Sequence, residues 1–311
     1  MQQLKVAVLG YGYLGKWHCQ KVEAAGATLF AIVEKFPVNA EAAKAAHPTA
    51  RVVSDLSEIL NQIDAAVVVT PTSTHHQLVK TLLENDKHVF CEKPLCFTLK
   101  EANEILALAQ TKNSVLQVGL SERFHEAWEI LNKDYSPYLK SPFTMRISRF
   151  APFKGRASDV DVISDVMIHD LDLMVYLTQK KPILVKATGH INKTTKWDHV
   201  LAYFDLPDNS SCSILSSRNH TREVRELEIA NSEGCFVLDM ATLEISVTRK
   251  NGEMEKRTCA KRDHLLLEHK AFYNSILNKS KTLVNVLDGH YANLLVDHVT
   301  KSLETHLSVS F

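Results

Sequence analysis

The sequence predicts an α/β protein of two domains: a doubly wound parallel sheet at residues 1–120, then an α+β domain with a large open, mostly antiparallel sheet at residues 121–311. Three observations support this fold class. A glycine-rich turn joins a strand pattern to a helix pattern near the start, strand and helix patterns then alternate, and successive strand patterns fill the second half. Alternation is typical of a parallel sheet, whereas runs of strands are typical of an antiparallel or mixed sheet.

Composition narrows the class of protein. The 36 Lys and Arg residues balance 36 Asp and Glu residues, so no net field attracts nucleic acid or an anionic membrane. No apolar run approaches the roughly 20 residues of a membrane span, and a strand pattern from Leu4 leaves no room for a signal peptide. The six cysteines form no C-x-x-C pair, so we expect reduced thiols in a cytoplasmic protein.

The glycine turn is Gly10-Tyr11-Gly12-Tyr13-Leu14-Gly15, between a predicted strand at 4–9 and a predicted helix at 16–25. In this context the first glycine allows a tight turn, the second lets backbone approach a pyrophosphate, and the third lets the helix pack on the strand. A second strand at 28–33 ends in Glu34, where a carboxylate suits the ribose hydroxyls of NAD. Glu34 therefore favours NAD. NADP stays possible, because the adjacent Lys35 suits a 2′-phosphate. We therefore predict a Rossmann dinucleotide-binding domain.

The alternation continues with strands predicted at 51–54, 65–69, 87–90 and 115–120, and helices at 39–47, 56–62, 74–84 and 99–112. Ligands of such a sheet lie beyond the carboxyl ends of its strands. The stretches 70–76 and 91–95 fall there. The ammonium of Lys93, directly before a proline, is expected to face the nicotinamide, with a surface lysine as the alternative. His75 begins a helix and either contacts the cofactor or has no role.

The second half contains one apolar helix pattern among many strand patterns. Helices are predicted at 121–132, 161–177, 263–277 and 287–306, and strands at 143–150, 183–190, 199–206, 211–217, 224–230, 234–239 and 243–249. A broad sheet with its helices mostly on one side leaves a face that must be covered. We therefore expect a homodimer or homotetramer built on this sheet.

The apolar helix carries Asp165, His169, Asp172 and Tyr176, spaced four, three and four residues apart. In an α-helix this spacing places them on one face. A carboxylate–imidazole pair on a mostly buried helix requires partners or a function. Three interpretations remain: a surface stripe of ions, a metal site formed by the histidine and both carboxylates, or an acid/base pair facing a substrate. Lys93 in the same crevice would repel a divalent ion, so we favour the acid/base pair and predict no metal.

Several motifs together resemble the family of NAD(P)-dependent glucose–fructose oxidoreductases and inositol dehydrogenases. The segments 70–75, 92–94, 118–124 and 165–172 resemble its T-P-x-x-x-H, E-K-P, V-G-F-N-R-R-F and D-x-G-x-H-x-x-D motifs. The resemblance implies a Lys–Asp–His constellation between a Rossmann domain and an open sheet, which assigns Lys93, Asp165 and His169 as catalytic residues. Met167 replaces the usual glycine, and Ser121 and Glu122 replace Asn-Arg, so contacts made by those residues are not carried over.

These stretches predict a dehydrogenase that takes hydride from a secondary alcohol of a sugar. His169, with a reference pKa of about 6.5, suits the base, Asp165 would orient it, and Lys93 would stabilise alkoxide charge. A non-catalytic NAD(P)-bound regulator and a metal-dependent enzyme are the alternatives. The predicted cofactor contacts are Gly10, Gly12, Tyr13, Leu14, Gly15, Glu34, Thr70, Pro71, His75, Glu92 and Lys93.

The substrate prediction depends on the segment before the apolar helix. Arg149, Lys154 and Arg156 lie within eight residues, with Phe150 and Phe153 between them. A solvated loop is one interpretation; the other is a cleft rim in which guanidinium groups bind a diphosphate and a ring stacks on a base. The segment resembles a bacterial subgroup that includes UDP-N-acetylglucosamine 3-dehydrogenases, so oxidation of that sugar at its 3-hydroxyl is the leading prediction, ahead of a free sugar or inositol. The predicted substrate contacts are Arg123, Arg149, Lys154, Arg156 and Asp172.

Overall fold

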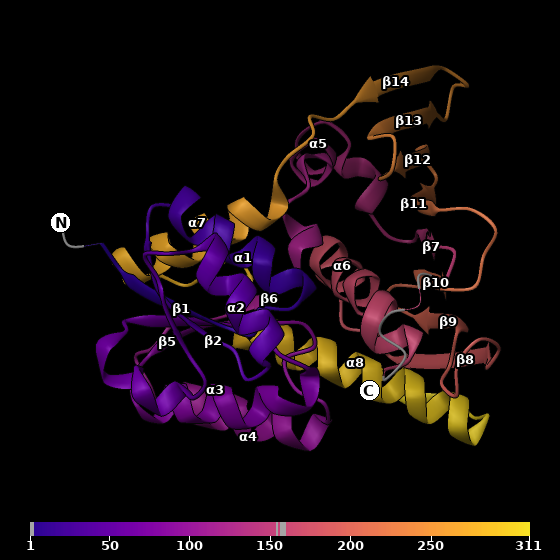
Figure 1. Ribbon diagram of the computed structural model, residues 1–311. Helices are drawn as coiled ribbons and strands as arrows, with labels where there is room; N and C mark the ends of the chain where they lie inside the picture. Colours follow the sequence, from indigo (N-terminus) through magenta and orange to yellow (C-terminus); the bar gives the residue numbers. More distant parts are fainter. Residues whose placement is uncertain (1–2, 154, 156–159) are drawn as a thin grey trace. The chain divides into compact units, whose positions relative to one another are not determined.

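The computed structural model describes residues 3–153, 155 and 160–311 (Figure 1). The chain forms two compact units, Met1–Ser121 with Asp263–Asn293, and Glu122–Arg262 with Leu294–Phe311. The first segment of the first unit ends at Ser121. The second half differs from the prediction, because residues 263–293 return to the first unit instead of belonging to the second.

The first unit contains the predicted doubly wound sheet. Its six strands are all parallel, in the order β3-β2-β1-β4-β5-β6. The order runs outward in both directions from β1, which places the glycine turn near the middle of the sheet. The strands are β1 Lys5–Leu9, β2 Thr28–Val33, β3 Arg51–Val53, β4 Ala65–Val68, β5 His88–Glu92 and β6 Leu116–Gly119.

Helices cover both faces of this sheet, with α1 and α7 on one side and α3 and α4 on the other (Figure 1). Residues 56–62, predicted as one helix, form two short 3₁₀ turns, Leu56–Glu58 and Leu60–Gln62. A third turn covers Thr72–Thr74. The helices are α1 Tyr13–Ala24, α2 Pro37–Ala46, α3 His75–Glu84, α4 Leu99–Gln110, α7 His264–Leu277 and α8 Val286–Thr305, the last of which ends in the second unit.

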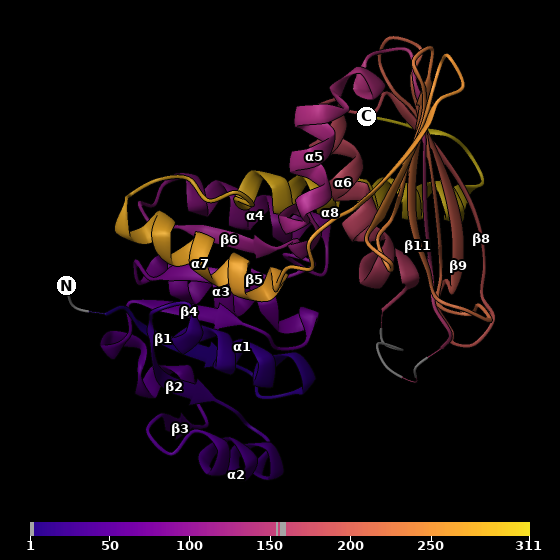
Figure 2. The ribbon, with the colours of Figure 1, turned by 90° about the horizontal axis from the view of Figure 1, so that it is seen from above.

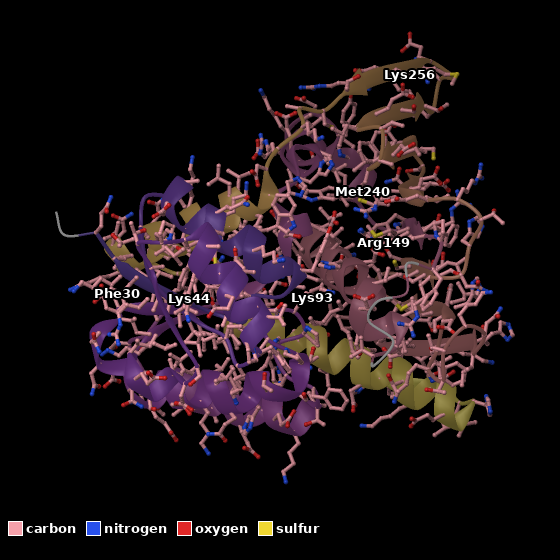
Figure 3. All side chains as sticks on the ribbon, in the orientation of Figure 1. Phe30, Lys44, Lys93, Arg149, Met240 and Lys256 are labelled. Atoms are coloured by element: carbon pink, nitrogen blue, oxygen red, sulfur yellow. The ribbon has the colours of Figure 1, made fainter. Side chains whose placement is uncertain are left out.

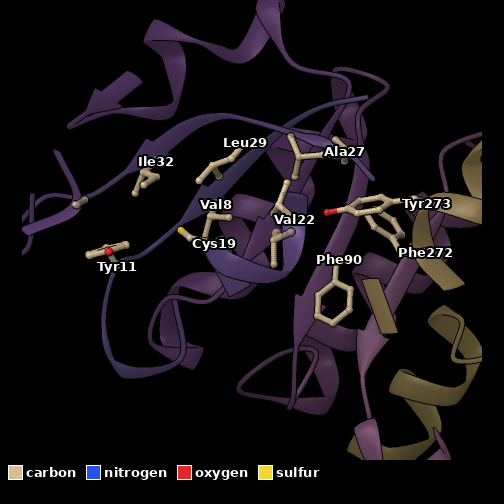
Figure 4. Close-up of a cluster of buried hydrophobic side chains, with 14 residues drawn as sticks. Val8, Tyr11, Cys19, Val22, Ala27, Leu29, Ile32, Phe90, Phe272 and Tyr273 are labelled. Atoms are coloured by element: carbon tan, nitrogen blue, oxygen red, sulfur yellow. The ribbon is translucent and has the colours of Figure 1, made fainter. Parts of the chain in front are cut away.

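The core beneath α1 explains why α7 belongs to the first unit. Phe272 and Tyr273 of α7 join a buried cluster with Val22 of α1 and Phe90 of β5 (Figure 4). The rings of Phe90 and Phe272 meet edge to face, with centroids 6.0 Å apart. Burying two aromatic side chains of this size contributes several kcal/mol, so the helix is an integral part of the nucleotide-binding unit.

The second unit is built on a nine-stranded sheet in the order β14-β13-β12-β11-β7-β10-β9-β8-β15. Every neighbouring pair is antiparallel except β7 and β10, which are parallel. The edge strands β14 and β15 were not predicted, because all five residues of β14 are exposed and β15 has only two residues. The strands are β7 Thr144–Phe150, β8 Leu184–His190, β9 His199–Asp205, β10 Ser211–Ser217, β11 Val224–Asn231, β12 Gly234–Asp239, β13 Glu244–Arg249, β14 Met254–Thr258 and β15 Val309–Ser310.

The helices of this unit lie on one face of its sheet (Figure 2). The helix predicted at 121–132 is a 3₁₀ turn, Ser121–Phe124, followed by α5 Glu126–Asp134, because the His125 side chain caps α5 by accepting the N–H of Ala127. A further 3₁₀ turn covers Ser136–Leu139, and a π-turn at Ile163–Met167 leads into α6 Ile168–Thr178. Across the described ranges, no helix has the length and apolar character needed to cross a membrane. All six cysteines carry free thiols.

Candidate active site

The three glycines of the turn have different structural roles. Gly10 has φ +97°, and a Cβ there would lie 2.8 Å from the carbonyl oxygen of Val69. A Cβ on Gly15 would overlap the carbonyl of Gly10. Around Gly12, by contrast, no heavy atom lies within 4 Å of the Cβ position. The first and third glycines are therefore required by packing, while the second leaves the open space that a pyrophosphate needs to approach the backbone.

The surroundings of the turn also fit a dinucleotide. Helix α1 has no acidic side chain in its first turn, so its positive end can attract a phosphate. Beside it, the Glu34 carboxylate accepts the N–H of Tyr11 at 2.8 Å and the N–H of Phe36 at 2.8 Å. Its side chain is largely buried at the end of β2, as expected for a carboxylate that receives ribose hydroxyls. The residues present are those that would hold the adenosine half of the cofactor.

His75 begins α3, as predicted, and its ring contacts backbone carbonyls of two rim segments. Its ring is buried, with Nδ1 2.9 Å from the carbonyl oxygen of Pro94 and Nε2 3.0 Å from that of Thr70. Burial lowers the pKa of His75, and the carbonyl contacts oppose that shift. The ring therefore joins two rim segments, 70–71 and 93–95, instead of offering a nitrogen to a cofactor. Thr70 is held from the same side, because the hydroxyl of Thr74 lies 2.7 Å from its own.

Lys93 directly follows the carboxyl end of β5, as predicted, and precedes a cis peptide bond to Pro94 (Figure 3). Its side chain is half-buried, and its N–H donates to Glu92 Oε2 at 3.2 Å. The other carboxylate oxygen of Glu92 lies 3.0 Å from His18 Nε2. Glu92 is thus held by protein groups on both oxygens.

In the second unit, the apolar helix is not a continuous α-helix. Asp165 lies in the π-turn and His169 in the first turn of α6; both are half-buried. A π-turn contains one more residue than an α-turn, so it shifts which side chains share a face. The predicted single stripe is therefore interrupted between Asp165 and His169. Met167, which stands where the family has glycine, is completely buried.

The lower part of the stripe is intact and is joined by Arg123. Its Nε donates to Asp172 Oδ2 at 2.8 Å and its Nη2 to Asp172 Oδ1 at 2.6 Å. The same guanidinium lies over the ring of Tyr176, 4.8 Å from the centroid. Arg123 and Asp172 have side chains only 7% and 4% exposed. Both were predicted to contact substrate. In the structure they instead form an ion pair with each other, and this pair holds α6 in position.

Arg149 also differs from the prediction. It lies on β7, within the strand predicted at 143–150, and its side chain bonds a residue of α6 instead of facing a substrate (Figure 3). Its guanidinium bonds Asp170 through Nε at 3.0 Å and Nη2 at 2.7 Å, and Glu122 through Nη1 at 3.0 Å. With 6% of its surface exposed, Arg149 supports the helix that carries His169 and is not available to a diphosphate. Lys154 and Arg156 lie outside the described residues.

The cluster around Arg149 was not found from the sequence. Burial acts to raise the pKa of Glu122, but the nearby charges of Arg149 and His169 and the Arg149 hydrogen bond lower it overall to about 2. Arg225 approaches the same carboxylate at 4.0 Å, and its side chain is 42% exposed. Two features of the sequence pointed to these carboxylates. Asp170 is an acid among apolar helix residues, and Glu122 stands at a position that departs from the family motif. Neither feature identifies Arg149 as the partner, 21 positions from Asp170 and 27 positions from Glu122.

The structure brings the predicted residues together in two groups. The first unit holds the glycine turn, Glu34, the rim segments and Lys93; the second holds Asp165, His169 and their supporting ion pairs. Among the described residues, no three His, Cys, Asp or Glu side chains are arranged to hold a metal ion.

Comparisons with known proteins match segments of both units. Residues 4–120 match the model of the oxidoreductase family with an NAD-binding Rossmann fold, and residues 146–237 match the C-terminal domain model of the same family. A UDP-N-acetylglucosamine 3-dehydrogenase of Acidithiobacillus ferrooxidans is 31% identical over 287 residues, which cover 89% of this chain and 90% of that protein. An inositol 2-dehydrogenase of Rhizobium meliloti is 27% identical over 249 residues, 76% of each.

Solved structures give the same result. A structure of the Acidithiobacillus ferrooxidans UDP-N-acetylglucosamine 3-dehydrogenase matches with a TM-score of 0.90 and 29% identity, covering 98% of this chain and 99% of that one. A scyllo-inositol dehydrogenase from Lactobacillus casei, with bound NAD(H) and scyllo-inositol, matches with a TM-score of 0.82 and 23% identity over 99% of each chain, which shows a shared fold. The chain therefore belongs to the Gfo/Idh/MocA oxidoreductase family, whose members are NAD-dependent dehydrogenases acting on CH–OH groups.

Proposed function

We propose that this protein oxidises the 3-hydroxyl of UDP-N-acetylglucosamine with NAD. The observation that carries the proposal is the similarity to the Acidithiobacillus ferrooxidans UDP-N-acetylglucosamine 3-dehydrogenase, which extends over 89% of this chain. The inositol 2-dehydrogenase of Rhizobium meliloti matches over only 76%. Near-complete coverage includes the segments around the apolar helix, where substrate selectivity is expected to reside.

Three side chains are assigned to the chemistry. When bound, the nicotinamide accepts a hydride from the carbon that carries the hydroxyl. His169 takes the hydroxyl proton at a ring nitrogen, and a general base of this kind contributes roughly 10²–10⁴-fold in rate. Lys93 donates a hydrogen bond to the same oxygen and stabilises its developing negative charge. Asp165 orients the imidazole and favours its protonated form after the transfer.

Cofactor choice is assigned to Glu34. Its carboxylate is oriented by two backbone N–H groups, which leaves lone pairs for the two ribose hydroxyls. A 2′-phosphate at the same place would meet a fixed negative charge, so NAD is preferred over NADP. Lys35 is exposed and follows Glu34 directly, so it is the residue that would act if NADP were preferred.

Recognition of the nucleotide is assigned to groups that solvent can reach. Phe153 is 36% exposed, as a ring that stacks on a base must be. Because Arg149 is paired with carboxylates that hold α6, another cation is needed for the phosphate oxygens. Arg225, which is partly exposed beside Glu122, is suited to that role. Lys154 and Arg156 remain part of the proposal on the basis of the sequence.

The protein is further proposed to form a homodimer or homotetramer through the large sheet. In the described part of the chain, no helix covers the second face of that sheet (Figure 2). Leu201 and Tyr203 of β9 are 40% and 45% exposed, and their neighbours Val200, Ala202 and Phe204 are fully buried. An apolar patch of this kind on an otherwise open sheet is typical of a subunit interface.

The decisive experiment is a substrate screen with purified protein. Formation of NADH is followed by absorbance after addition of NAD with UDP-N-acetylglucosamine, UDP-glucose, free N-acetylglucosamine, glucose or myo-inositol, and the sugar product is analysed for a 3-keto group. We expect turnover with UDP-N-acetylglucosamine and much less with any free sugar. Turnover with inositol or glucose and none with a UDP-sugar would reject the substrate. Bound NADH with no turnover on any of them would indicate a regulator.

A further inference from the structure

A buried chain of polar side chains crosses the first unit from α7 to the end of β5. Tyr273 Oη lies 2.9 Å from His269 Nδ1, His269 Nε2 lies 2.9 Å from His18 Nδ1, and His18 Nε2 lies 3.0 Å from Glu92 Oε1. Both histidines are completely buried and Tyr273 is 3% exposed. The ring of Phe90 stacks on His269 with centroids 5.4 Å apart. We call Tyr273, His269, His18 and Glu92 the relay.

One arrangement of protons satisfies every contact. Tyr273 donates its hydroxyl proton to His269 Nδ1, His269 donates from Nε2 to His18 Nδ1, and His18 donates from Nε2 to the carboxylate. Each imidazole is then neutral, with one nitrogen donating and the other accepting. Burial holds the pKa of His269 well below its usual value and raises the pKa of Tyr273, so the imidazole of His269 stays neutral and Tyr273 keeps its proton. All donors therefore point toward Glu92.

Glu92 is held on three sides at the end of the relay. Oε1 accepts from His18, Oε2 accepts the N–H of Lys93 at 3.2 Å, and the carboxylate lies over Gly119. A Cβ on Gly119 would be 2.8 Å from Oε1, so the space for the carboxylate exists because this position of β6 is glycine. A carboxylate fixed in this way cannot rotate without losing hydrogen bonds.

The charges that face Glu92 come from several elements. Burial acts to raise the pKa of Glu92, but the hydrogen bond from His18 and the charge of Lys93 lower it overall. The charge of Glu92 also acts to raise the pKa values of His75 of α3 and of the Cys91 thiol of β5. Among these groups, only His18 and the Lys93 backbone hydrogen-bond the carboxylate in the described structure.

We propose that His18, acting through Glu92, is a positioning residue for Lys93 in the dehydrogenase reaction. This inference rests on the proposed function, which makes Lys93 the donor to the reacting oxygen. Glu92 immediately precedes Lys93 and binds its N–H, so the orientation of the carboxylate sets both the backbone from which Lys93 projects and the charge beside its ammonium. A purely structural relay would stabilise the fold and leave turnover unchanged.

Two isosteric variants of His18 separate these roles. In His18→Gln, the side-chain N–H₂ replaces Nε2 and keeps the bond to Glu92, while the bond to His269 is lost. In His18→Asn, the side-chain oxygen replaces Nδ1 and keeps the bond to His269, while the bond to Glu92 is lost. If the relay positions Lys93, His18→Asn lowers kcat by roughly 10²-fold, as misplacement of a reacting group by about 1 Å does. His18→Gln retains most of kcat, and KM for NAD changes little in either variant.

The pH profile gives an independent measurement. Without the His18 donor, the pKa of Glu92 rises, so the carboxylate takes a proton at higher pH. In a plot of kcat against pH, the acidic limb therefore moves to higher pH in His18→Asn and stays in place in His18→Gln. Equal kcat values and superimposable pH profiles in the two variants overturn the proposal. So does equal loss of kcat that simply follows equal loss of thermal stability.

Two further variants keep the test decisive. Gly119→Ala displaces the Glu92 carboxylate without altering a histidine, so it is expected to lower kcat as His18→Asn does. It therefore replaces His18→Asn as the test if that variant does not fold. His88→Asn is the matched control: His88 begins β5, at the opposite end from Lys93, and accepts the N–H of Val115. It is expected to change stability but not the acidic limb.

Lys93→Met separates the two proposals. Full activity in Lys93→Met refutes the proposed role of Lys93, whereas an inactive Lys93→Met with unaffected His18 variants refutes the relay alone.

Discussion

The guanidinium of Arg149 binds Asp170 through three contacts of 3.0, 3.0 and 2.7 Å, and neither side chain is more than 7% exposed. This pair joins β7 to α6 immediately beside His169. A buried pair is costly to break, because removal of one partner leaves the other charge without compensation. The position of the helix that carries the assigned base is therefore fixed by a strand residue that is distant in sequence.

Arg149→Met should destabilise the protein by about 3–5 kcal/mol, since Asp170 and Glu122 would both lose their cation. The free energy of unfolding in urea, followed by circular dichroism, measures the loss. Arg146→Met is the matched control, because Arg146 lies on the same strand, pairs with Glu226 and Glu228, and is 54% exposed. There the expected loss is below about 1 kcal/mol. Similar losses in both variants would contradict a supporting role for Arg149.

Glu122 should make stability depend on pH under acidic conditions. Its pKa is lowered to about 2 in the folded protein from an ordinary value of 4.5, so its contribution is complete above pH 4.5 and is lost as pH falls toward 2. A shift of this size corresponds to about 3 kcal/mol. Glu122→Gln should therefore flatten the decline in unfolding free energy across that range, while Glu41→Gln, at an exposed carboxylate, should not. An unchanged slope in Glu122→Gln would show that the pair is not coupled to folding.

Lys93→Met and His169→Asn should each lower kcat by several orders of magnitude. A lost general base alone accounts for roughly 10²–10⁴-fold. NADH should still bind, because neither residue belongs to the glycine turn or to the Glu34 site. Stopped-flow turnover and NADH fluorescence titration measure the two properties separately. Near-native turnover in either variant would exclude that residue from the acid/base role.

Glu34→Gln should weaken the preference for NAD over NADP. The substitution keeps an acceptor for only one of the N–H groups of Tyr11 and Phe36, because they bond different carboxylate oxygens, and it removes the charge that repels a 2′-phosphate. The ratio of kcat/KM for the two cofactors is the measurement, and Lys35→Gln is the companion variant. A native enzyme that prefers NADP, with the preference lost in Lys35→Gln, would reverse the assignment.

Tyr203→Lys should lower the assembly state in solution. Charge introduced into the apolar patch of β9 opposes burial against a second copy, whereas Lys44→Glu, at an exposed position of α2 in the first unit, leaves the Leu201–Tyr203 patch intact. Multi-angle light scattering at micromolar concentration gives the mass of each variant. A native protein that is monomeric under these conditions would contradict the proposed interface.

Local sequence patterns were sufficient for most of the fold. The six strands of the first sheet and seven of the nine strands of the second were predicted, because apolar runs and turn residues act within a few positions. The turn between β1 and α1 was likewise predicted with a role for each glycine; in the structure Gly10 has a positive φ, as a tight turn requires, and Gly15 packs closely against the carbonyl of Gly10. The family followed from short motifs whose residues are close in sequence.

Tertiary structure decided everything that depends on partners distant in the chain. Arg149 was predicted to contact substrate because the sequence does not show that Asp170 and Glu122 bind it. His18 and His269 are 251 residues apart, and only packing of α7 on α1 makes one the partner of the other. The π-turn before α6 has no local signal, since its extra residue is accommodated by packing rather than by propensity. Hydrophobic periodicity is a local property of the sequence. A buried charge, by contrast, needs a partner because an unpaired charge is costly in a low-dielectric interior, and the tertiary structure decides which residue that partner is.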